Sequence, residues 1–385
     1  MATSTLPAEA VVDLSAVREN VRELCRRAPS AQVMAVVKAD AYGHGLLPCA
    51  AAARAGGATW LGVAQLAEGL ALRAAGDRGR LLSWLHVPGD DFAGAVRADI
   101  DLSASAPWAV DQIADAARDA GVSARVHLKI DTGLSRGGAT PADWDELVGA
   151  ALAAQADGAV TVVGVWSHLA WADAPDHPTV RHQREVFDLA MARAEALGVR
   201  PEVRHLANSA ATLTNPAAHY DLVRPGLAVY GLSPVPDLHD SAALGLRPAM
   251  SLRATLALVK RVPAGSGVAY GHTYVTERET VLGLVPLGYA DGVPRAAGNV
   301  GPLLVAGAVH RIAGRVSMDQ VVVDLGDDEA ARAARAGHAV VLFGDGAGGE
   351  PTAQDWAEAT GTIAYEIVAR VGGRVPRTHV GGDVP

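Results

Sequence analysis

The stretch Ala35-Val-Val-Lys38-Ala-Asp-Ala-Tyr-Gly-His-Gly45 contains an apolar run, a lysine and a loop with glycine, and this pattern indicates the fold of the first part of the chain. Its apolar start completes the run Val33–Val37, which has the length and composition of a buried strand. Lys38 ends this run, and a loop that contains glycine follows it. The stretch therefore predicts a strand that carries a lysine at its carboxyl end.

This lysine stands out because lysine is rare in the chain. Of the 33 basic residues, 30 are arginine, and the only lysines are Lys38, Lys129 and Lys260. Arginine replaces lysine readily on a surface, but it cannot lose its proton and form an imine as lysine can. A lysine that is retained at a strand end is therefore a candidate for amine chemistry.

Short apolar runs alternate with longer helical stretches through the first 230 residues. Amphipathic stretches such as Leu14–Arg27 and Val180–Leu197 separate the runs. We expect eight strands, at Gln32–Lys38, Thr59–Ala64, Leu81–His86, Asp99–Ser103, Ala124–Ile130, Val160–His168, Val203–Ala207 and Asp221–Arg224. Eight strands that alternate with helices predict an α/β fold with a (β/α)8 TIM-type barrel, and a doubly wound sheet is the alternative.

The pattern changes after Ala243, where the apolar runs lie closer together and Gly, Pro and Asp separate them. This spacing is typical of a mostly antiparallel β domain. We expect its strands and closing helices at Ser251–Val262, Thr280–Leu287, Val300–Val305, Val309–Val316, Gln320–Leu325, Ala339–Phe343, Ala353–Thr360 and Ile363–Val371. The predicted domains are thus a barrel over residues 10–243 and a β-rich C-terminal domain over residues 244–385, with which residues 1–9 could pack.

Composition excludes several classes of partner. The formal net charge of −9 argues against binding to nucleic acid or to an anionic membrane. No apolar run is long enough to span a bilayer, and the N-terminal residues lack the pattern of a signal peptide. Cys25 and Cys49 provide neither a disulfide framework nor the spacing of a metal site. We therefore expect a cytoplasmic protein without a metal centre.

Three strand ends of the predicted barrel carry residues suited to a phosphorylated cofactor. Lys38 ends the first strand, Ser209 follows the seventh, and Arg224-Pro-Gly226 follows the eighth. Active residues of such barrels lie at the carboxyl ends of the strands, and phosphate groups favour the last two loops. A hydroxyl and backbone N–H groups near glycine suit a phosphate dianion. These residues indicate a pyridoxal phosphate site, or else a Schiff-base aldolase whose substrate is phosphorylated.

Nine short motifs, in order along both domains, carry a resemblance to a known family. They are Val36-Val-Lys38-Ala-Asp-Ala-Tyr42-Gly-His-Gly45, His127-Leu-Lys129-Ile-Asp-Thr-Gly-Leu-Ser-Arg136, Gly164-Val-Trp-Ser-His168-Leu-Ala, Asn208-Ser209-Ala-Ala, Val223-Arg224-Pro-Gly226-Leu-Ala-Val-Tyr230-Gly, Gly267-Val-Ala-Tyr270-Gly-His-Thr, Pro286-Leu-Gly-Tyr289-Ala-Asp-Gly-Val-Pro-Arg295, Gly314-Arg-Val-Ser-Met318-Asp319 and Tyr365-Glu366. Together they resemble the alanine racemases, which are fold-type III enzymes that use pyridoxal 5'-phosphate. The resemblance implies interconversion of L- and D-alanine, with D-alanine supplied for cell-wall peptidoglycan.

The resemblance implies a role for each catalytic residue. Racemisation removes the α-proton from one face of the substrate and returns it on the other, and two bases on opposite faces are the simplest arrangement. Lys38 would hold the cofactor and act on one face, and Tyr270 of the partner subunit would act on the other. His168 and Arg224 would assist Tyr270, because a phenol is a poor base at neutral pH. Arg224 would also face the pyridine nitrogen, to which it can only donate.

The resemblance also implies a binding set. Tyr42, Ser209, Gly226, Leu227 and Tyr365 would hold the phosphate, and Asn208 would also belong to the cofactor site. Arg136 would contact the phenolic oxygen of the cofactor and the substrate. Tyr289, Met318 and Asp319 would shape the substrate end. For Asp291, Arg295 and Asp319, interface salt bridges are the alternative role. Lys129 matches a lysine that can be carbamylated in relatives, and an ordinary ion pair is the alternative. Trp84 lies where the family often has a smaller residue beside the cofactor ring, so stacking there could differ.

Two other functions stay open at this point. A racemase for serine or for a broader set of amino acids would share most of these motifs. A pyridoxal phosphate carrier without turnover would need no second base, so Tyr270 in the second domain argues against it. The resemblance favours a homodimer with shared active sites that acts on alanine.

Overall fold

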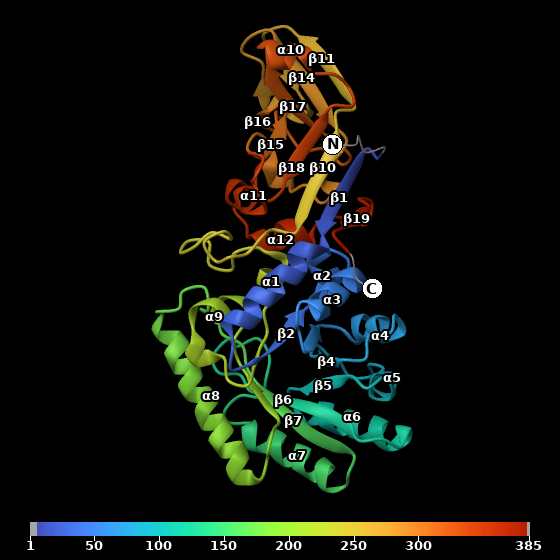
Figure 1. Cartoon of the computed structure of the whole chain (residues 1–385), viewed down its shortest axis with the longest axis vertical. Helices are drawn as coiled ribbons and strands as arrows, with labels where there is room; N and C mark the ends of the chain where they lie inside the picture. The colour runs from blue at the N-terminus through green and yellow to red at the C-terminus, as the bar shows by residue number, and fades with distance from the viewer. Residues whose placement is uncertain (1–5, 383–385) are drawn as a thin grey trace. The chain divides into compact units, whose positions relative to one another are not determined.

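In a computed structural model of the chain, which describes residues 6–382, the eight expected strands form one parallel sheet (Figure 1). The strands follow the order β8-β7-β6-β5-β4-β3-β2-β9. Their bounds are β2 (Gln32–Val36), β3 (Trp60–Val63), β4 (Arg80–Ser83), β5 (Asp101–Ala104), β6 (Ala124–Lys129), β7 (Val160–Trp166), β8 (Val203–His205) and β9 (Leu222–Val223). The predicted α/β class with a TIM-type barrel is confirmed.

Backbone hydrogen bonds bring the ring of strands close to closure. β9 pairs in parallel with β2, and beside β8 the amide of Asp221 donates to Arg204 O (3.1 Å). The amide of Arg224 donates to Ala207 O (2.9 Å) one step further along. The residues that follow β8 and β9 are therefore neighbours, as the carboxyl ends of adjacent barrel strands must be.

Helices alternate with these strands. They are α1 (Leu14–Arg27), α3 (Leu46–Ala55), α4 (Leu66–Ala74), α5 (Phe92–Arg97), α6 (Pro107–Ala120), α7 (Trp144–Ala156), α8 (Pro178–Leu197) and α9 (Ser209–Thr214). The sequence marks both ends of α8, since Pro178 opens it and Gly198 ends it with a φ of 116°. Proline suits the first helical position and glycine suits the left-handed cap.

The segment α2 (Lys38–Gly43) departs from the expected loop. The four residues Ala39, Asp40, Ala41 and Tyr42 all have φ of 53–54°, and Gly43 follows with a φ of 82°. They form one turn of left-handed helix, although a left-handed conformation costs a residue with a side chain about 1–2 kcal/mol. Consecutive residues in this conformation directly after Lys38 are a backbone outlier of the kind that clusters at functional sites.

A second set of strands forms three sheets. The largest has the order β16-β15-β18-β10-β1-β19, a second has the order β11-β14-β17, and β12 pairs with β13. The bounds are β1 (Ala8–Asp13), β10 (Met250–Thr255), β11 (Leu258–Val262), β12 (Gly267–Val268), β13 (Tyr274–Val275), β14 (Thr280–Val285), β15 (Pro302–Val305), β16 (Ala308–Arg311), β17 (Val321–Gly326), β18 (Ala339–Phe343) and β19 (Arg377–Val380). Three α-helices accompany them among the described residues: α10 (Glu329–Ala333), α11 (Ala353–Thr360) and α12 (Ala364–Ala369). The mostly β-stranded C-terminal domain is therefore confirmed.

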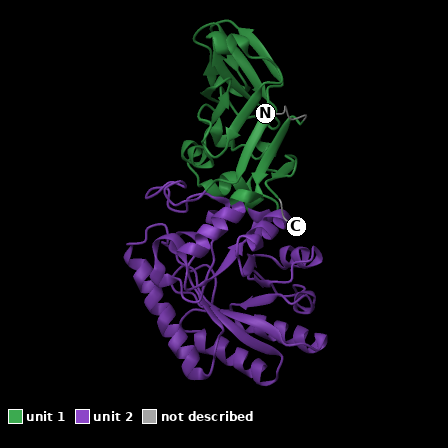
Figure 2. Ribbon diagram, viewed as in Figure 1, with its two compact units in different colours: residues 1–16, 42–45, 247–383 green, residues 17–41, 46–246, 384–385 purple. Residues whose placement is uncertain are grey.

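The described residues divide into two compact units (Figure 2). Unit 1 contains residues up to 16, residues 42–45 and residues 247 onwards, and unit 2 contains residues 17–41 and 46–246. Unit 1 is thus built from three segments of the chain, whereas the sequence-based limits of 10–243 and 244–385 provide for residues 1–9 and for residues 244 onwards but not for residues 42–45. Within residues 6–382, no helix has the length and apolar character needed to cross a membrane.

Candidate active site

Lys38 follows directly on β2, at the carboxyl end of the barrel strands. The amide of Val37 donates to Gly62 O (2.9 Å), so the β2 ladder with β3 continues to the residue before Lys38. The Lys38 amine lies 5.9 Å from the centroid of the Trp84 ring. Burial, and then the charge of Arg136, lower the pKa of Lys38. A lowered pKa leaves more of the amine in its neutral, nucleophilic form.

The carboxylate of Glu68 holds the backbone around Lys38. It accepts hydrogen bonds from the amide of Ala39 (2.5 Å), at the start of the left-handed turn, and from the amides of Ala64 (3.0 Å) and Gln65 (3.1 Å) after β3. One side chain on α4 therefore ties the end of β3 to the residue that follows Lys38. Its negative charge also acts to raise the pKa of Lys38, against the larger effect of burial.

Four cationic side chains of unit 2 gather at these strand ends. Lys129 ends β6, and its amine lies 4.3 Å from the centroid of the Trp166 ring. Burial, and then the charges of Arg224 and Arg136, lower the pKa of Lys129 to about 8. Lys38 acts on Lys129 in the same direction. The site therefore has an excess of positive charge, which suits an anionic ligand.

Arg224 follows β9 and is buried, with 5% of its surface exposed. Its Nη2 donates to Ser167 O (2.7 Å), Leu206 O (3.2 Å) and Nδ1 of His168 (3.3 Å), and its Nη1 lies 3.2 Å from Nδ1 of His205. Burial lowers the pKa of Arg224 to about 9, which still leaves the guanidinium charged at neutral pH. Since a guanidinium can only donate, Nδ1 of each histidine must accept.

This requirement fixes the protonation of His168. Burial, and then the charge of Arg224, hold the pKa of His168 well below its ordinary value, so the ring is neutral. Because Nδ1 accepts from Arg224, the single ring proton must lie on Nε2. His168 is therefore a hydrogen-bond donor through Nε2.

The loops after β8 and β9 are joined at Ser209. Its Oγ accepts from the amides of Gly226 (2.7 Å) and Ala228 (3.3 Å). Asn208 caps α9, where its Oδ1 accepts from the amide of Ala211 (3.1 Å). Leu227 begins a 3-10 helix that runs to Tyr230 and is buried. A hydroxyl and two backbone amides thus converge at the strand ends.

The other predicted site residues belong to unit 1. Tyr42 is buried, and its ring lies 6.2 Å from that of Tyr365. Burial raises the pKa of Tyr42, so it is a neutral hydrogen-bond donor and not a base. Tyr270 lies in a 3-10 helix, Tyr270–His272, and 71% of its surface is exposed within this single chain. So exposed a tyrosine has room to contact another molecule.

Two predicted substrate-end residues of unit 1 lie on segments that are hydrogen-bonded together, Tyr289 in a 3-10 helix (Tyr289–Asp291) and Met318 in a loop. The amide of Tyr289 donates to Ser317 O and the amide of Ala290 donates to Met318 O, both at 3.0 Å. Arg374 bridges the carboxylates of Asp291 (3.1 Å) and Asp319 (2.7 Å) on the same two segments. Asp319 thus forms an ion pair within one chain. The Tyr289 and Met318 side chains remain 42% and 52% exposed.

Sequence reasoning missed several residues that unit 2 brings to this site. Trp166 lies against three predicted residues, with its ring 6.1 Å from Trp84 and beside Lys129 and Arg224. It also stacks on His205 at 5.6 Å with an interplanar angle of 4°. Trp166 stands inside the motif that contains His168 and is the last residue of β7, so its strand-end position was the available signal.

Comparisons with known proteins agree with this arrangement. The family model described as alanine racemase, N-terminal domain, matches residues 12–234, and the model described as alanine racemase, C-terminal domain, matches residues 249–379. The alanine racemase of Frankia casuarinae is 61% identical over 371 residues, which cover 96% of each chain. The alanine racemase of Streptomyces coelicolor is 59% identical over 384 residues, 98% of this chain and 97% of the relative. The crystal structure of alanine racemase from D-cycloserine producing Streptomyces lavendulae superposes with a TM-score of 0.96, at 60% identity and covering 98% of both chains. The chain therefore belongs to the alanine racemase family.

Proposed function

We propose that this alanine racemase uses pyridoxal 5'-phosphate and two bases, Lys38 and Tyr270 of the partner subunit. The observation that carries the proposal is the position of Lys38, at a barrel strand end among cations and with a pKa lowered by burial and by Arg136. An amine in these surroundings is suited to covalent attachment of an aldehyde cofactor.

The residues of unit 2 fit the cofactor. Its phosphate needs donors and positive charge, and the Ser209 hydroxyl, whose oxygen accepts from the amides of Gly226 and Ala228, can donate its own proton. Its pyridine nitrogen needs a donor that does not give up its proton, and the buried Arg224 is one. Trp84 and Trp166 offer apolar surface beside Lys38 and Lys129. From unit 1, Tyr42 and Tyr365 would contribute phenolic donors to the phosphate.

When bound, the cofactor supplies an electron sink that makes the α-proton of alanine more acidic. Lys38 Nζ would move this proton on one face of the α-carbon. The Tyr270 oxygen of the partner subunit would move it on the other face. His168, which carries its proton on Nε2, would donate to that oxygen and favour the phenolate. Arg136 would orient the anionic groups of cofactor and substrate.

Alanine is the substrate that the family indicates, and we propose that the exposed Tyr289 and Met318 narrow the entrance around its methyl group. Serine differs by one hydroxyl, and a small apolar pocket rejects an added hydroxyl by only about a hundredfold. We also propose a cytoplasmic role in supplying D-alanine for peptidoglycan, which the family membership supports.

Borohydride reduction tests the role of Lys38. Reduction of the cofactor-loaded protein, followed by peptide mapping, should place the pyridoxyl label on Lys38. Before reduction, the same preparation should racemise L-alanine, which circular dichroism follows. A label on Lys129 or Lys260 would contradict the assignment, and labelling without racemisation would favour a carrier.

Mixed dimers test whether the site is shared. Lys38→Ala and Tyr270→Phe subunits should each be inactive alone, and a mixed dimer would contain one intact site and one doubly altered site. Random exchange makes about half of the dimers mixed, so roughly a quarter of wild-type activity should return. With subunit exchange verified by mass, no recovery would refute a shared site.

A further inference from the structure

A column of four buried polar residues runs through the barrel of unit 2. Asp101 begins β5, His127 lies in β6, His205 ends β8, and Arg224 follows β9. The first three have no exposed surface, and Arg224 has 5%. Hydrogen bonds that are shielded from water are electrostatically stronger than exposed ones. The column therefore joins the amino end of one strand to the candidate active site.

Each link in the column is a hydrogen bond. Asp101 Oδ2 lies 3.2 Å from His127 Nε2, His127 Nδ1 lies 2.9 Å from His205 Nε2, and His205 Nδ1 lies 3.2 Å from Arg224 Nη1. Gly164 in β7, the strand between β6 and β8, leaves room for the middle link. A Cβ at that position would lie 2.0 Å from His127 Nδ1.

The chemistry of the two ends allows only one direction of donation. Arg224 can only donate, so His205 Nδ1 accepts and the proton of the neutral ring lies on Nε2. His205 Nε2 then donates to His127 Nδ1, and His127 must carry its own proton on Nε2. That proton points to Asp101, whose carboxylate can only accept. Burial, and then the charge of Arg224, hold the pKa of His205 well below its ordinary value, which agrees with a neutral ring.

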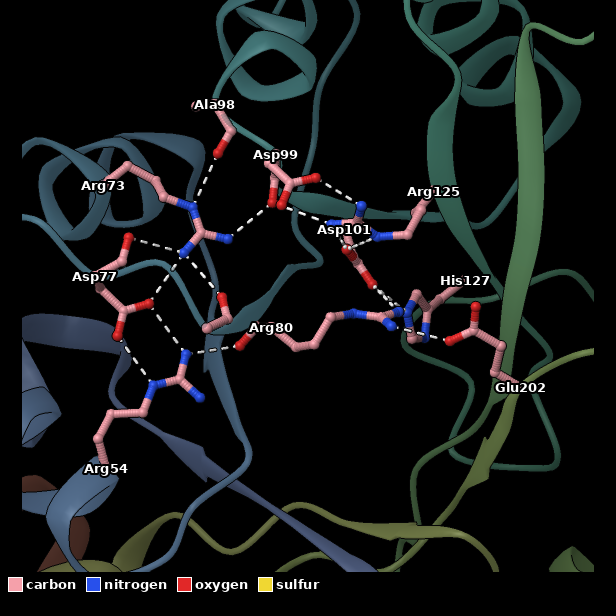
Figure 3. A network of polar contacts seen from close by, with 11 residues as sticks. Arg54, Arg73, Asp77, Arg80, Ala98, Asp99, Asp101, Arg125, His127 and Glu202 are labelled. Atoms are coloured by element: carbon pink, nitrogen blue, oxygen red, sulfur yellow. Dashed lines mark hydrogen bonds and ion pairs between the residues drawn. The ribbon is translucent and has the colours of Figure 1, made fainter.

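Asp101 is kept ionised by its hydrogen bond to His127 and by two arginines at the outer end of the column (Figure 3). Arg125 Nε donates to its Oδ1 (2.6 Å) and Arg80 Nη2 donates to its Oδ2 (2.8 Å). Burial alone would raise the pKa of Asp101, but the hydrogen bond to His127 and the nearby positive charges lower it to about 2. A neutral acid there could donate to His127 and reverse the direction of the links.

We propose that Asp101 is a positioning residue for Arg224, which it orients and polarises through His127 and His205. A reversed column would turn a proton of His205 towards the N–H of Arg224, and the two donors would repel. With the present direction, His205 offers Arg224 a lone pair. The effect of this orientation of Arg224 on the cofactor rests on the proposed function, in which Arg224 faces the pyridine nitrogen. The direction of hydrogen-bond donation along the column can be tested without the cofactor.

Histidine-ring 15N NMR of the cofactor-free protein tests the direction. Couplings from ring carbon protons to each nitrogen identify which nitrogen carries the proton, and His127→Asn and His205→Asn spectra assign the two signals. We expect both rings to be neutral with the proton on Nε2. A proton on Nδ1 of His205, or a charged ring at either position, would overturn the proposal. This result needs no activity.

Asp101→Asn tests the effect on the site, because the amide N–H group must face either Arg125 at the place of Oδ1 or Arg80 and His127 at the place of Oδ2. The matched control is Asp77→Asn. Asp77 pairs with Arg54 and Arg73 in the neighbouring cluster of Figure 3, and its described contacts include neither histidine. We expect Asp101→Asn to change the His127 ring signals and to lower kcat about tenfold or more relative to Asp77→Asn, with KM for alanine nearly unchanged.

Comparable thermal midpoints of the two variants would exclude a loss of fold as the cause. A kcat of Asp101→Asn within about threefold of Asp77→Asn would refute the proposal. If Asp101→Asn does not fold, Gly164→Ala is the alternative variant, because it breaks the hydrogen bond between His127 and His205 and leaves the Asp101 ion pairs intact. The expected loss of kcat and the result that would refute the proposal are the same as for Asp101→Asn. If wild type and Asp77→Asn both failed to racemise alanine, the proposed function would be wrong while the NMR result would still stand.

Discussion

Replacing Lys129 by Met should stabilise the cofactor-free protein at neutral pH, and this effect should fade in base. Lys129 Nζ lies over the Trp166 ring, and burial and the charges of Arg224 and Arg136 lower its pKa from 10.5 to about 8. A lysine whose pKa is lowered on folding binds its proton less well in the folded state. The wild type is therefore penalised wherever the unfolded chain is protonated, and the penalty falls as the pH rises from 8 towards 10.5.

The size of the effect follows from the two pKa values. A shift from 10.5 to about 8 corresponds to about 3 kcal/mol at about pH 7. At about pH 9.5 the same relation leaves about 1.4 kcal/mol. The stability difference between wild type and Lys129→Met should therefore change by about 2 kcal/mol between these two pH values. Methionine keeps the length of the apolar stem, so its packing on Trp166 should cost little at either pH.

Urea unfolding in buffers free of carbon dioxide measures this difference. Lys260→Met is the control, because Lys260 lies on β11 and is exposed. Its stability relative to wild type should hardly change with pH. If the free energies of unfolding of Lys129→Met and wild type differed by the same amount at both pH values, the lowered pKa of Lys129 would be refuted. Added bicarbonate gives a second result, since a carbamate on Lys129 would form an anion beside Arg136 and stabilise wild type but not Lys129→Met.

Substitutions at three other positions have defined outcomes. Glu68→Ala removes the acceptor of three backbone amides and should lower the free energy of unfolding by about 1–3 kcal/mol. Glu68→Gln keeps one acceptor oxygen and should lose less of this free energy. Equal urea midpoints for the two variants would contradict a stabilising role of these hydrogen bonds. Gly62→Ala places a Cβ 2.6 Å from the Trp84 ring, so it should weaken binding of pyridoxal phosphate in a fluorescence titration, and unchanged affinity would remove Trp84 from the site. Tyr365→Phe should weaken binding of the phosphorylated cofactor but not of pyridoxal, and an equal loss for both would exclude a phosphate contact.

The barrel could be predicted from the sequence because each of its strands can be recognised from residues that are adjacent in the chain. Apolar runs such as Val160–Trp166 are short, bounded and separated by amphipathic helices, and all eight appear in the parallel sheet. β1 (Ala8–Asp13) was not predicted as a strand. It pairs with β10 and β19, which lie more than 200 residues away, so no local signal could identify its partners.

Site residues that follow a strand could be predicted from the sequence, whereas polar residues inside the barrel could not. Lys38 and Arg224 follow strands, and their residue types are unusual enough to suggest a role. His127 and Asp101 occupy interior positions, where a polar side chain has meaning only through its partners. Those partners lie on other strands, so the column they form becomes visible only when the register of β5, β6 and β8 is known.

The left-handed turn after Lys38 is strained, and contacts at its start and at its end hold it. Four residues in this conformation cost about 1–2 kcal/mol each, so contacts elsewhere must offset the strain. At its start, the amide of Ala39 is held by Glu68. At its end, Gly43 O accepts from Arg377 Nε (3.0 Å), and a side chain at position 43 would meet Val368 O at 2.5 Å. The turn therefore fits only a glycine at its end and an acceptor at its start, and a loss at either end would release the backbone that carries the Lys38 amine.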